Sequence, residues 1–168
     1  YRTIASIYRT KDYTKSFEYF QKSADLGNSD SLNDLGNIYK QGKWVEQSYS
    51  KMIECFEKSA DLGNSKGIYS LGYCYEYGCG IEKDYKKAFE YYKKSADLNN
   101  SDALYRLGDF YYKGIAVEKD YTKAIDFFTK SSEFGNSDAI YRLGDCYYKG
   151  IGVEKDAKKA FEYSERLI

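Results

Sequence analysis

The residues of this chain that could carry chemistry are few in type. The sequence contains four cysteines, many carboxylates and no histidine. Without an imidazole the chain cannot form a Ser-His-Asp triad, a Cys-His pair or a His-ligated zinc site. The cysteines, at Cys55, Cys74, Cys79 and Cys146, include no C-x-x-C pair. We therefore expect no catalytic residue, no metal site and no cofactor, and most enzyme classes are excluded.

Glycine-rich segments and carboxylate pairs also have a structural explanation. The segments 78–80 and 150–152 look like phosphate-binding loops, but such a loop follows a strand and opens a helix. These two lie between predicted helices and recur along the chain. The predicted helices also carry two Asp-Arg pairs at a spacing of four residues, Asp102 with Arg106 and Asp138 with Arg142. That spacing favours exposed ion pairs on one helix face rather than an acid and base pair.

The charge and hydropathy of the chain limit the classes of partner that we expect it to bind. The 26 Lys and Arg residues offset the 26 Asp and Glu residues, so no strong field attracts nucleic acid or an anionic membrane. No apolar run approaches the roughly 18 residues that a membrane span requires. An apolar fraction of 42% with 31% charged residues is typical of a folded, water-soluble chain. We expect a protein or peptide ligand, no nucleic acid and no membrane insertion of this segment.

An internal repeat organises the chain. The string from Lys22 to Ser29 recurs with starts at Lys58, Lys94 and, more loosely, Lys130. Each start lies 36 residues after the previous one. A Leu-Gly pair follows the same period, at Leu35, Leu71, Leu107 and Leu143 with the glycine that follows each. A constant period over four copies indicates a repeat architecture.

Each period contains two helical patterns, which we call helix A and helix B. Helix A is expected from the N-cap Ser101, with its apolar face at Leu104, Leu107, Gly108 and Tyr111, and with Gly114 as its end. Helix B is expected after the N-cap Asp120, with Tyr121, Ala124, Ile125, Phe128 and Ser131 on one face and Gly135 as its end.

Helices this short are marginal alone, so neighbouring pairs must stack to close a core. The predicted fold is all-α, an α-solenoid of stacked antiparallel helix pairs. Gly108 costs about 1 kcal/mol inside a helix relative to alanine. That cost predicts a close approach of helix B at small residues such as Ala88, Ala124 and Ala160.

The repeat positions resemble the Sel1-like repeat, a relative of the tetratricopeptide repeat. The resemblance rests on Leu107-Gly108, Tyr111, Gly114, Val117 to Tyr121, Lys123-Ala124 and Lys130-Ser131. It implies a right-handed solenoid that spans 1–168 as a single repeat domain. The units are 1–28 (partial and divergent), 29–64, 65–100, 101–136 and 137–168 (partial). The first unit has a loop five residues shorter, between Ile4 and Tyr13. The chain starts and stops inside helical patterns, so we expect a segment of a longer protein.

The positions of the cysteines provide evidence on the cellular compartment of the protein. Some bacterial members of the family carry a disulfide at positions equivalent to Ala96 and Ala103, and some are described as β-lactamase-like. This sequence lacks cysteine at those positions in every unit, which argues against a β-lactamase-like activity. The absence of the disulfide favours reduced thiols and therefore the cytoplasm. The endoplasmic reticulum and secretion remain open as alternatives. Cys74 and Cys146 share a repeat position with Phe110 and are expected to be buried. Cys55 takes the place of Tyr91 and Phe127.

The resemblance also implies a partner-binding surface, because helix A lines the concave side in this family. Three stripes of side chains flank its packed face: Asn33, Tyr69, Tyr105 and Tyr141; Asn37, Tyr73, Asp109 and Asp145; Lys40, Glu76, Tyr112 and Tyr148. Arg106 and Arg142 lie beside them. Exposed tyrosine and arginine are typical of interface hot spots. The alternative is that the tyrosines pack against neighbouring helices. If Tyr105 faces a groove, Tyr105→Ala should change stability little.

The predicted function is a noncatalytic protein–protein interaction module that acts as an adaptor or scaffold. The alternative is a regulatory or targeting arm of an enzyme whose catalytic domain lies outside this segment. Trp44 occupies a loop position that is Gly80, Ala116 or Gly152 elsewhere. It is either an exposed contact or a plug for a degenerate repeat.

Overall fold

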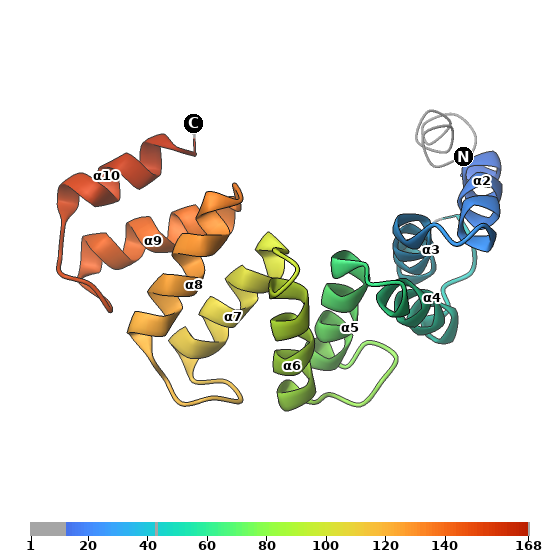
Figure 1. Ribbon diagram of the computed structural model, residues 1–168, viewed down its shortest axis with the longest axis horizontal. Coiled ribbons are helices and arrows are strands. Elements are labelled where there is room, and N and C mark those ends of the chain that lie inside the picture. Colours follow the sequence, from blue (N-terminus) through green and yellow to red (C-terminus); the bar gives the residue numbers. More distant parts are fainter. Residues whose placement is uncertain (1–12, 43, 168) are drawn as a thin grey trace. The chain divides into compact units, whose positions relative to one another are not determined.

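The computed structural model describes residues 13–42 and 44–167, and every regular element in those ranges is an α-helix (Figure 1). The helices are α2 (Tyr13–Asp25), α3 (Ser29–Gln41), α4 (Tyr49–Asp61), α5 (Ser65–Tyr77), α6 (Tyr85–Ala96), α7 (Ser101–Lys113), α8 (Tyr121–Glu133), α9 (Ser137–Lys149) and α10 (Ala157–Glu165). The predicted all-α fold of repeated helix pairs is confirmed. The expected short loop between Ile4 and Tyr13 lies outside the described residues.

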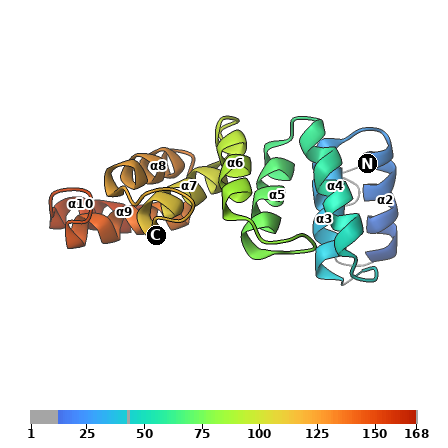
Figure 2. The same ribbon diagram turned by 90° about the horizontal axis from the view of Figure 1, so that it is seen from below.

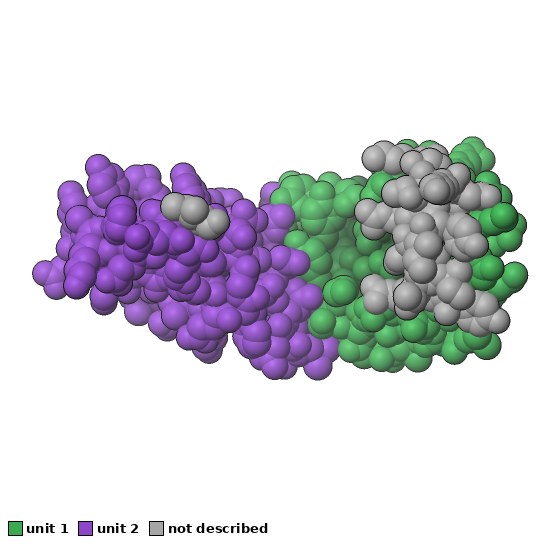
Figure 3. Space-filling view, turned by 90° about the horizontal axis from the view of Figure 1, so that it is seen from above, with its two compact units in different colours: residues 1–84 green, residues 85–168 purple. Residues whose placement is uncertain are grey.

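The chain forms two compact units, which Figure 3 distinguishes by colour. Unit 1 covers residues 1–84 and contains α2 to α5, and unit 2 covers residues 85–168 and contains α6 to α10. In unit 1, α3 packs against α2 and α4, and α5 packs against α3 and α4. In unit 2, α7 packs against α6 and α8, and α9 packs against α8 and α10 (Figure 2). Because no described helix exceeds 13 residues, this packing supplies most of their stability.

Side chains at the helix ends explain where each helix begins and stops. The N-cap of α7 is Asn100, whose Oδ1 accepts a hydrogen bond from the Ala103 amide at 3.0 Å. The predicted cap Ser101 is instead the first helical residue, because Asn100 caps the helix one position earlier and asparagine caps helices as well as serine does. Asp120 caps α8 as predicted, accepting from the Lys123 amide at 3.0 Å. Gly114 ends α7 with a left-handed φ of 72°, which glycine adopts without strain.

The N-cap asparagines also join consecutive A helices. Asn136 Nδ2 of the α9 cap donates to Asp102 Oδ1 of α7 at 2.8 Å. Asn64 Nδ2 of the α5 cap donates to Asp30 Oδ1 of α3 at 3.2 Å. These bonds connect residues 34 positions apart in the chain, so they set the register of one helix pair on the next.

The core of unit 2 explains the repeated glycine of helix A. Phe128 is completely buried together with Ala124, Leu143 and Cys146. A Cβ atom at Gly108 would lie 2.5 Å from Cε1 of the Phe128 ring and 3.2 Å from the Ala124 carbonyl oxygen. The close approach of helix B is therefore confirmed, and an aromatic ring makes the closest contact.

The core of unit 1 settles the role of Trp44. Phe20, Leu32, Leu35 and Ile38 are buried together. Trp44 is half-buried against this cluster, and its ring stacks on Phe20 with centroids 6.5 Å apart. The indole therefore fills space beside a divergent repeat, and it is not an exposed contact.

Candidate partner-binding surface

Four of the predicted site residues of unit 2 form one cluster, which we call the Arg142 cluster: Tyr105, Asp109 and Tyr112 of α7 with Arg142 of α9. Arg142 Nη2 lies 3.3 Å from Asp109 Oδ1, and its guanidinium lies 5.5 Å from the Tyr112 ring centroid. Lys113 Nζ donates to the other carboxylate oxygen of Asp109 at 2.6 Å. The sequence predicted a pair between Arg142 and Asp138, but Arg142 reaches back to the preceding A helix instead.

The electrostatics of the Arg142 cluster keep its charges paired. Burial of the guanidinium disfavours its charge, but a hydrogen bond with Tyr105 and the Asp109 carboxylate outweigh that effect and raise the pKa of Arg142. Burial also raises the pKa of the Tyr112 hydroxyl. Asp109 is only 5% exposed, so its carboxylate positions Arg142 and is not presented to a partner.

The tyrosines of α7 contribute to the core. The Tyr105 ring is half-buried with its centroid 5.8 Å from that of Phe128, and the Tyr112 ring lies 6.4 Å from it. The Arg106 guanidinium lies 5.9 Å from the Tyr105 ring. Because Tyr105 covers Phe128, its removal would uncover core surface. The ring does not face a groove alone, so the condition for a small effect of Tyr105→Ala on stability is not met.

Among the predicted partner-binding residues, the most exposed lie on α9, the last described A helix. Tyr141 is 65% exposed and Tyr148 is 62% exposed. Between them, Asp145 forms an ion pair with Lys149 at 2.8 Å. These three predicted residues line a hollow of about 380 Å³ between α9 and α10, together with Ile140, Gly144, Ala157, Ala160, Phe161, Ser164 and Leu167.

The predicted residues of unit 1 make mainly internal contacts. Asn33 is buried, and its Oδ1 accepts a hydrogen bond from Ser70 Oγ of α5 at 2.9 Å. Asn37 Nδ2 donates to the Asn33 carbonyl oxygen at 3.1 Å. Tyr69 is half-buried, and so is Tyr73, whose ring lies 3.7 Å from Lys40 Nζ. Asn33 therefore joins α3 to α5 and is not available to a partner.

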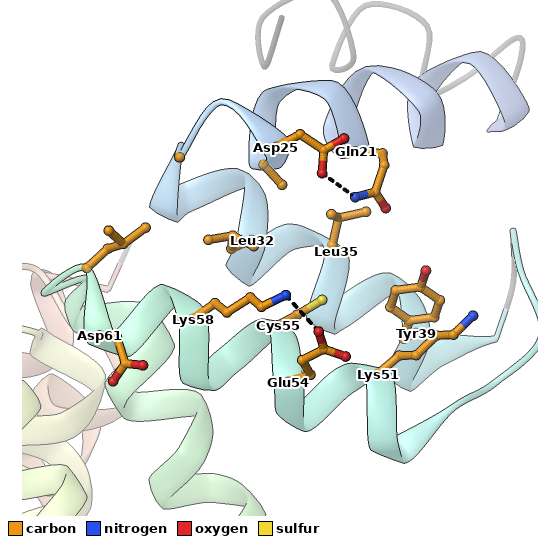
Figure 4. Close-up of a pocket in the computed structure, with 13 residues that line it drawn as sticks. Gln21, Asp25, Leu32, Leu35, Tyr39, Lys51, Glu54, Cys55, Lys58 and Asp61 are labelled. Atoms are coloured by element: carbon orange, nitrogen blue, oxygen red, sulfur yellow. Dashed lines mark hydrogen bonds and ion pairs between the residues drawn. The ribbon is translucent and has the colours of Figure 1, made fainter.

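Sequence reasoning missed a second kind of site, a groove between successive B helices. In unit 1 the groove lies between α2 and α4 over α3, and it encloses about 610 Å³ (Figure 4). In unit 2 a groove of about 540 Å³ lies between α6 and α8 over α7. Their linings correspond at positions 72 residues apart, as in Leu35 with Leu107 and Tyr39 with Tyr111. The period revealed these positions, but their apolar character led to their assignment to the core.

The cysteines are free thiols at all four positions. Cys74 and Cys146 are buried as predicted, and Cys55 and Cys79 are half-buried. Burial raises the pKa of Cys74 to about 12 and the pKa values of Cys55 and Cys146 to about 11. A raised pKa favours the unreactive thiol over the thiolate.

Alkylation should report these thiol environments. At pH 7.5 we expect Cys146 to react with iodoacetamide about 10- to 100-fold more slowly in the folded chain than in urea, because its thiolate fraction is lower. The rate should rise as the pH approaches 11. Residue-resolved mass spectrometry measures both rates, and equal rates in the folded and the unfolded chain at pH 7.5 would contradict the burial.

Two other kinds of site, a membrane-spanning helix and a metal centre, are absent from the described residues. Over residues 13–42 and 44–167, no helix has the length and apolar character needed to cross a membrane. The same ranges contain no group of three or more His, Cys, Asp or Glu side chains placed to hold a metal ion.

Comparisons with solved structures agree on the fold. A Sel1 repeat protein from Oxalobacter formigenes matches with a TM-score of 0.92 and 27% identity, over 99% of this chain and 70% of that one. The protective antigen c5321 of uropathogenic Escherichia coli, which displays an SLR fold, matches with a TM-score of 0.80 and 30% identity, over 99% of this chain and 37% of that one. Cysteine rich protein B of Helicobacter pylori matches with a TM-score of 0.61 and 29% identity, over 77% of this chain and 92% of that one. A comparison with curated proteins found no significant match.

The sequence model of one repeat family covers almost the entire chain. The Sel1 repeat matches residues 6–28, 29–64, 65–100, 101–136 and 137–167. Proteins built from these repeats are generally protein–protein interaction modules. The repeat period, the helix pairs and the five matched units show that the chain belongs to the Sel1 repeat family.

Proposed function

We propose that this chain is a noncatalytic adaptor or scaffold module that binds a protein partner through its A helices. The observation that carries the proposal is the surface of α9. Tyr141 and Tyr148 of α9 expose more than half of their area and line the same hollow, and Asp145 lies between them in the helix. A large aromatic ring with a hydroxyl group offers both contact area and a hydrogen bond, which is the chemistry of an interface hot spot.

The environment of the equivalent residues in α7 supports this role. Tyr105 and Tyr112 are half-buried, and Tyr112 is covered by the Arg142 guanidinium of the next A helix. A partner helix with an arginine would therefore meet Tyr148 and Asp145 as Arg142 meets Tyr112 and Asp109. In this proposal the exposed tyrosines contact the partner, while Asn33 and Asp109 position the helices that carry them.

Affinity capture from lysate of the source cell tests the proposal. The bait is the chain itself beside a Tyr141→Ser/Tyr148→Ser variant, which removes the two exposed rings. We expect a protein retained by the parent to be depleted by at least tenfold on the variant, because hot-spot residues contribute about 2 kcal/mol or more. The retained protein is then purified and titrated against both forms.

The matched control is Leu98→Ser/Phe134→Ser. Those residues are 49% and 53% exposed and lie in the turns that follow α6 and α8, outside the hollow between α9 and α10. All forms are first shown to be equally helical and equally stable. Equal retention by parent and both variants would contradict the A-helix surface. Retention by none would contradict the adaptor role and favour the regulatory or targeting arm.

The compartment follows from the thiol chemistry in this proposal. All four cysteines are free, and none lies in the position of the family disulfide. Free buried thiols are typical of a reducing environment. We propose the cytoplasm as the site of action.

A further inference from the structure

A recurring aromatic stack lies at one edge of the B-helix grooves. In unit 2, Phe127 of α8 stacks on Tyr111 of α7 with centroids 5.6 Å apart and planes within 9°. Phe89 of α6 meets the same tyrosine edge-on at 5.8 Å, and Lys123 Nζ lies 5.3 Å from its ring. The tyrosine of helix A is therefore packed by an edge-on phenylalanine, a stacked ring and a lysine.

The next helix pair repeats the stack. Tyr163 of α10 stacks on Tyr147 of α9 with centroids 5.7 Å apart and planes within 13°. Lys159 Nζ lies 5.1 Å from the Tyr147 ring. The stacked ring and the lysine are thus features of the repeat and are not peculiar to one unit.

Unit 1 keeps this arrangement except for one member. Phe17 meets Tyr39 edge-on at 5.9 Å, and Lys51 Nζ lies 5.4 Å from the Tyr39 ring. The position of the stacked ring is occupied by Cys55, whose side chain points from α4 toward α3 (Figure 4). A thiol covers far less of a tyrosine face than a phenyl ring does.

The groove of unit 1 extends further along its second B helix, α4, than the groove of unit 2 does along α8. Among the described residues, the lining of the unit 2 groove ends at Phe127. The unit 1 lining continues past Cys55 to Glu54 and Lys51. In the part of the chain that the structure describes, the face of Tyr39 that a ring would cover thus lines a groove whose floor on α3 is apolar, at Leu32 and Leu35.

We propose that the groove between α2 and α4 binds an aromatic side chain of a partner peptide, which stacks on Tyr39 in the place that Phe127 takes on Tyr111. The site lies between B helices, so it is separate from the A-helix surface of the proposed function. The ring would regain the stacking contact that the pairs α7–α8 and α9–α10 make internally, and aromatic pairs prefer such offset-stacked arrangements.

The charges of the groove select the residues next to that ring. Asp25, Glu54 and Asp61 line it with Lys51 and Lys58, which leaves a net charge of about −1. Lys58 Nζ pairs with Glu54 at 2.7 Å, so the remaining carboxylates are those of Asp25 and Asp61, at the ends of α2 and α4. The negative ends of two helix dipoles add to this potential. Because Lys51 lies 5.4 Å from the Tyr39 ring, the peptide carries its arginine or lysine on the side of the aromatic residue that extends toward Asp25 and Asp61.

Titration with capped pentapeptides tests the site, with amide NMR spectra as the readout. The probe has the sequence Gly-Arg-Phe-Arg-Gly, and the reference peptides have Ala in place of Phe or Glu in place of both Arg. We expect shifts centred on Tyr39 and Cys55, and an affinity at least tenfold higher for the probe than for the Ala peptide, because burial of a phenyl ring contributes that much or more. The Glu peptide should bind more weakly, and the difference should shrink with salt.

Variants at Cys55 provide the structural control. Cys55→Phe and Cys55→Tyr place in the groove the rings that the chain itself has at 127 and 163, so they should abolish binding of the probe and raise the unfolding midpoint. Cys55→Ala keeps the groove open and should bind as the parent does. The proposal is overturned if Cys55→Phe and Cys55→Tyr bind the probe undiminished, or if the Ala peptide binds the parent equally well. The peptide comparison on the parent decides the matter even where a ring variant does not fold.

Discussion

Replacement of Phe128 by alanine is expected to lower the free energy of unfolding by about 3 to 5 kcal/mol. The Phe128 side chain is completely buried, and it fills the space above Gly108 on α7. Its ring also contacts those of Tyr105 and Tyr112. Truncation removes buried apolar surface and leaves a cavity between α7 and α8, which neither helix can close without breaking its own packing.

Urea unfolding followed by far-ultraviolet circular dichroism measures this loss, and amide hydrogen exchange of α8 locates it. The control is Phe134→Ala, because that phenylalanine is 53% exposed, and its removal should change stability by less than about 0.5 kcal/mol. Similar losses for the two variants would show that the Phe128 ring is not the centre of this core.

Replacement by alanine is expected to change the free energy of unfolding in opposite directions at two equivalent glycines, Gly108 and Gly144. Gly108→Ala should destabilise the chain by about 1 to 3 kcal/mol, because the added methyl group would overlap the buried Phe128 ring. The better helix propensity of alanine, about 1 kcal/mol, offsets only part of that cost.

Gly144→Ala is the matched variant in the following repeat. Its added Cβ would meet the Ala160 carbonyl oxygen at 3.5 Å and Tyr163 Cβ at 3.6 Å, which are ordinary contacts. The position of Phe128 is taken there by Ser164. We therefore expect Gly144→Ala to raise the free energy of unfolding by up to about 1 kcal/mol. Chemical denaturation of both variants checks the sign, and a stabilised Gly108→Ala variant would contradict the tight contact.

The two proposed binding surfaces depend on different residues. The A-helix surface depends on two tyrosines of α9, Tyr141 and Tyr148. The B-helix groove depends on one small residue, Cys55, where equivalent helix pairs have a ring. Binding at the two surfaces can therefore be abolished separately, by Tyr141→Ser/Tyr148→Ser for the A-helix surface and by Cys55→Phe for the B-helix groove.

The sequence by itself determined the repeat period, the helix pairs and most helix ends. Those features depend on contacts within a few residues, such as the spacing of Leu104, Leu107 and Tyr111 or the cap at Asp120. Local spacing repeats faithfully, so four copies of one pattern reinforce the same assignment. The cap of α7 was misplaced by one residue because asparagine and serine both cap helices well.

The tertiary structure alone decided which side chains are available to a partner. Arg142 pairs with Asp109 rather than Asp138, Tyr105 covers Phe128, and Trp44 packs on Phe20. The open face of Tyr39 likewise depends on how α4 lies against α3. Each of these outcomes joins two different helices or, for Trp44, a loop and a helix, and most join residues more than 20 positions apart. Helical periodicity places a side chain on one face of its helix, but the neighbouring helix that covers that face is set by the packing of one helix pair on the next.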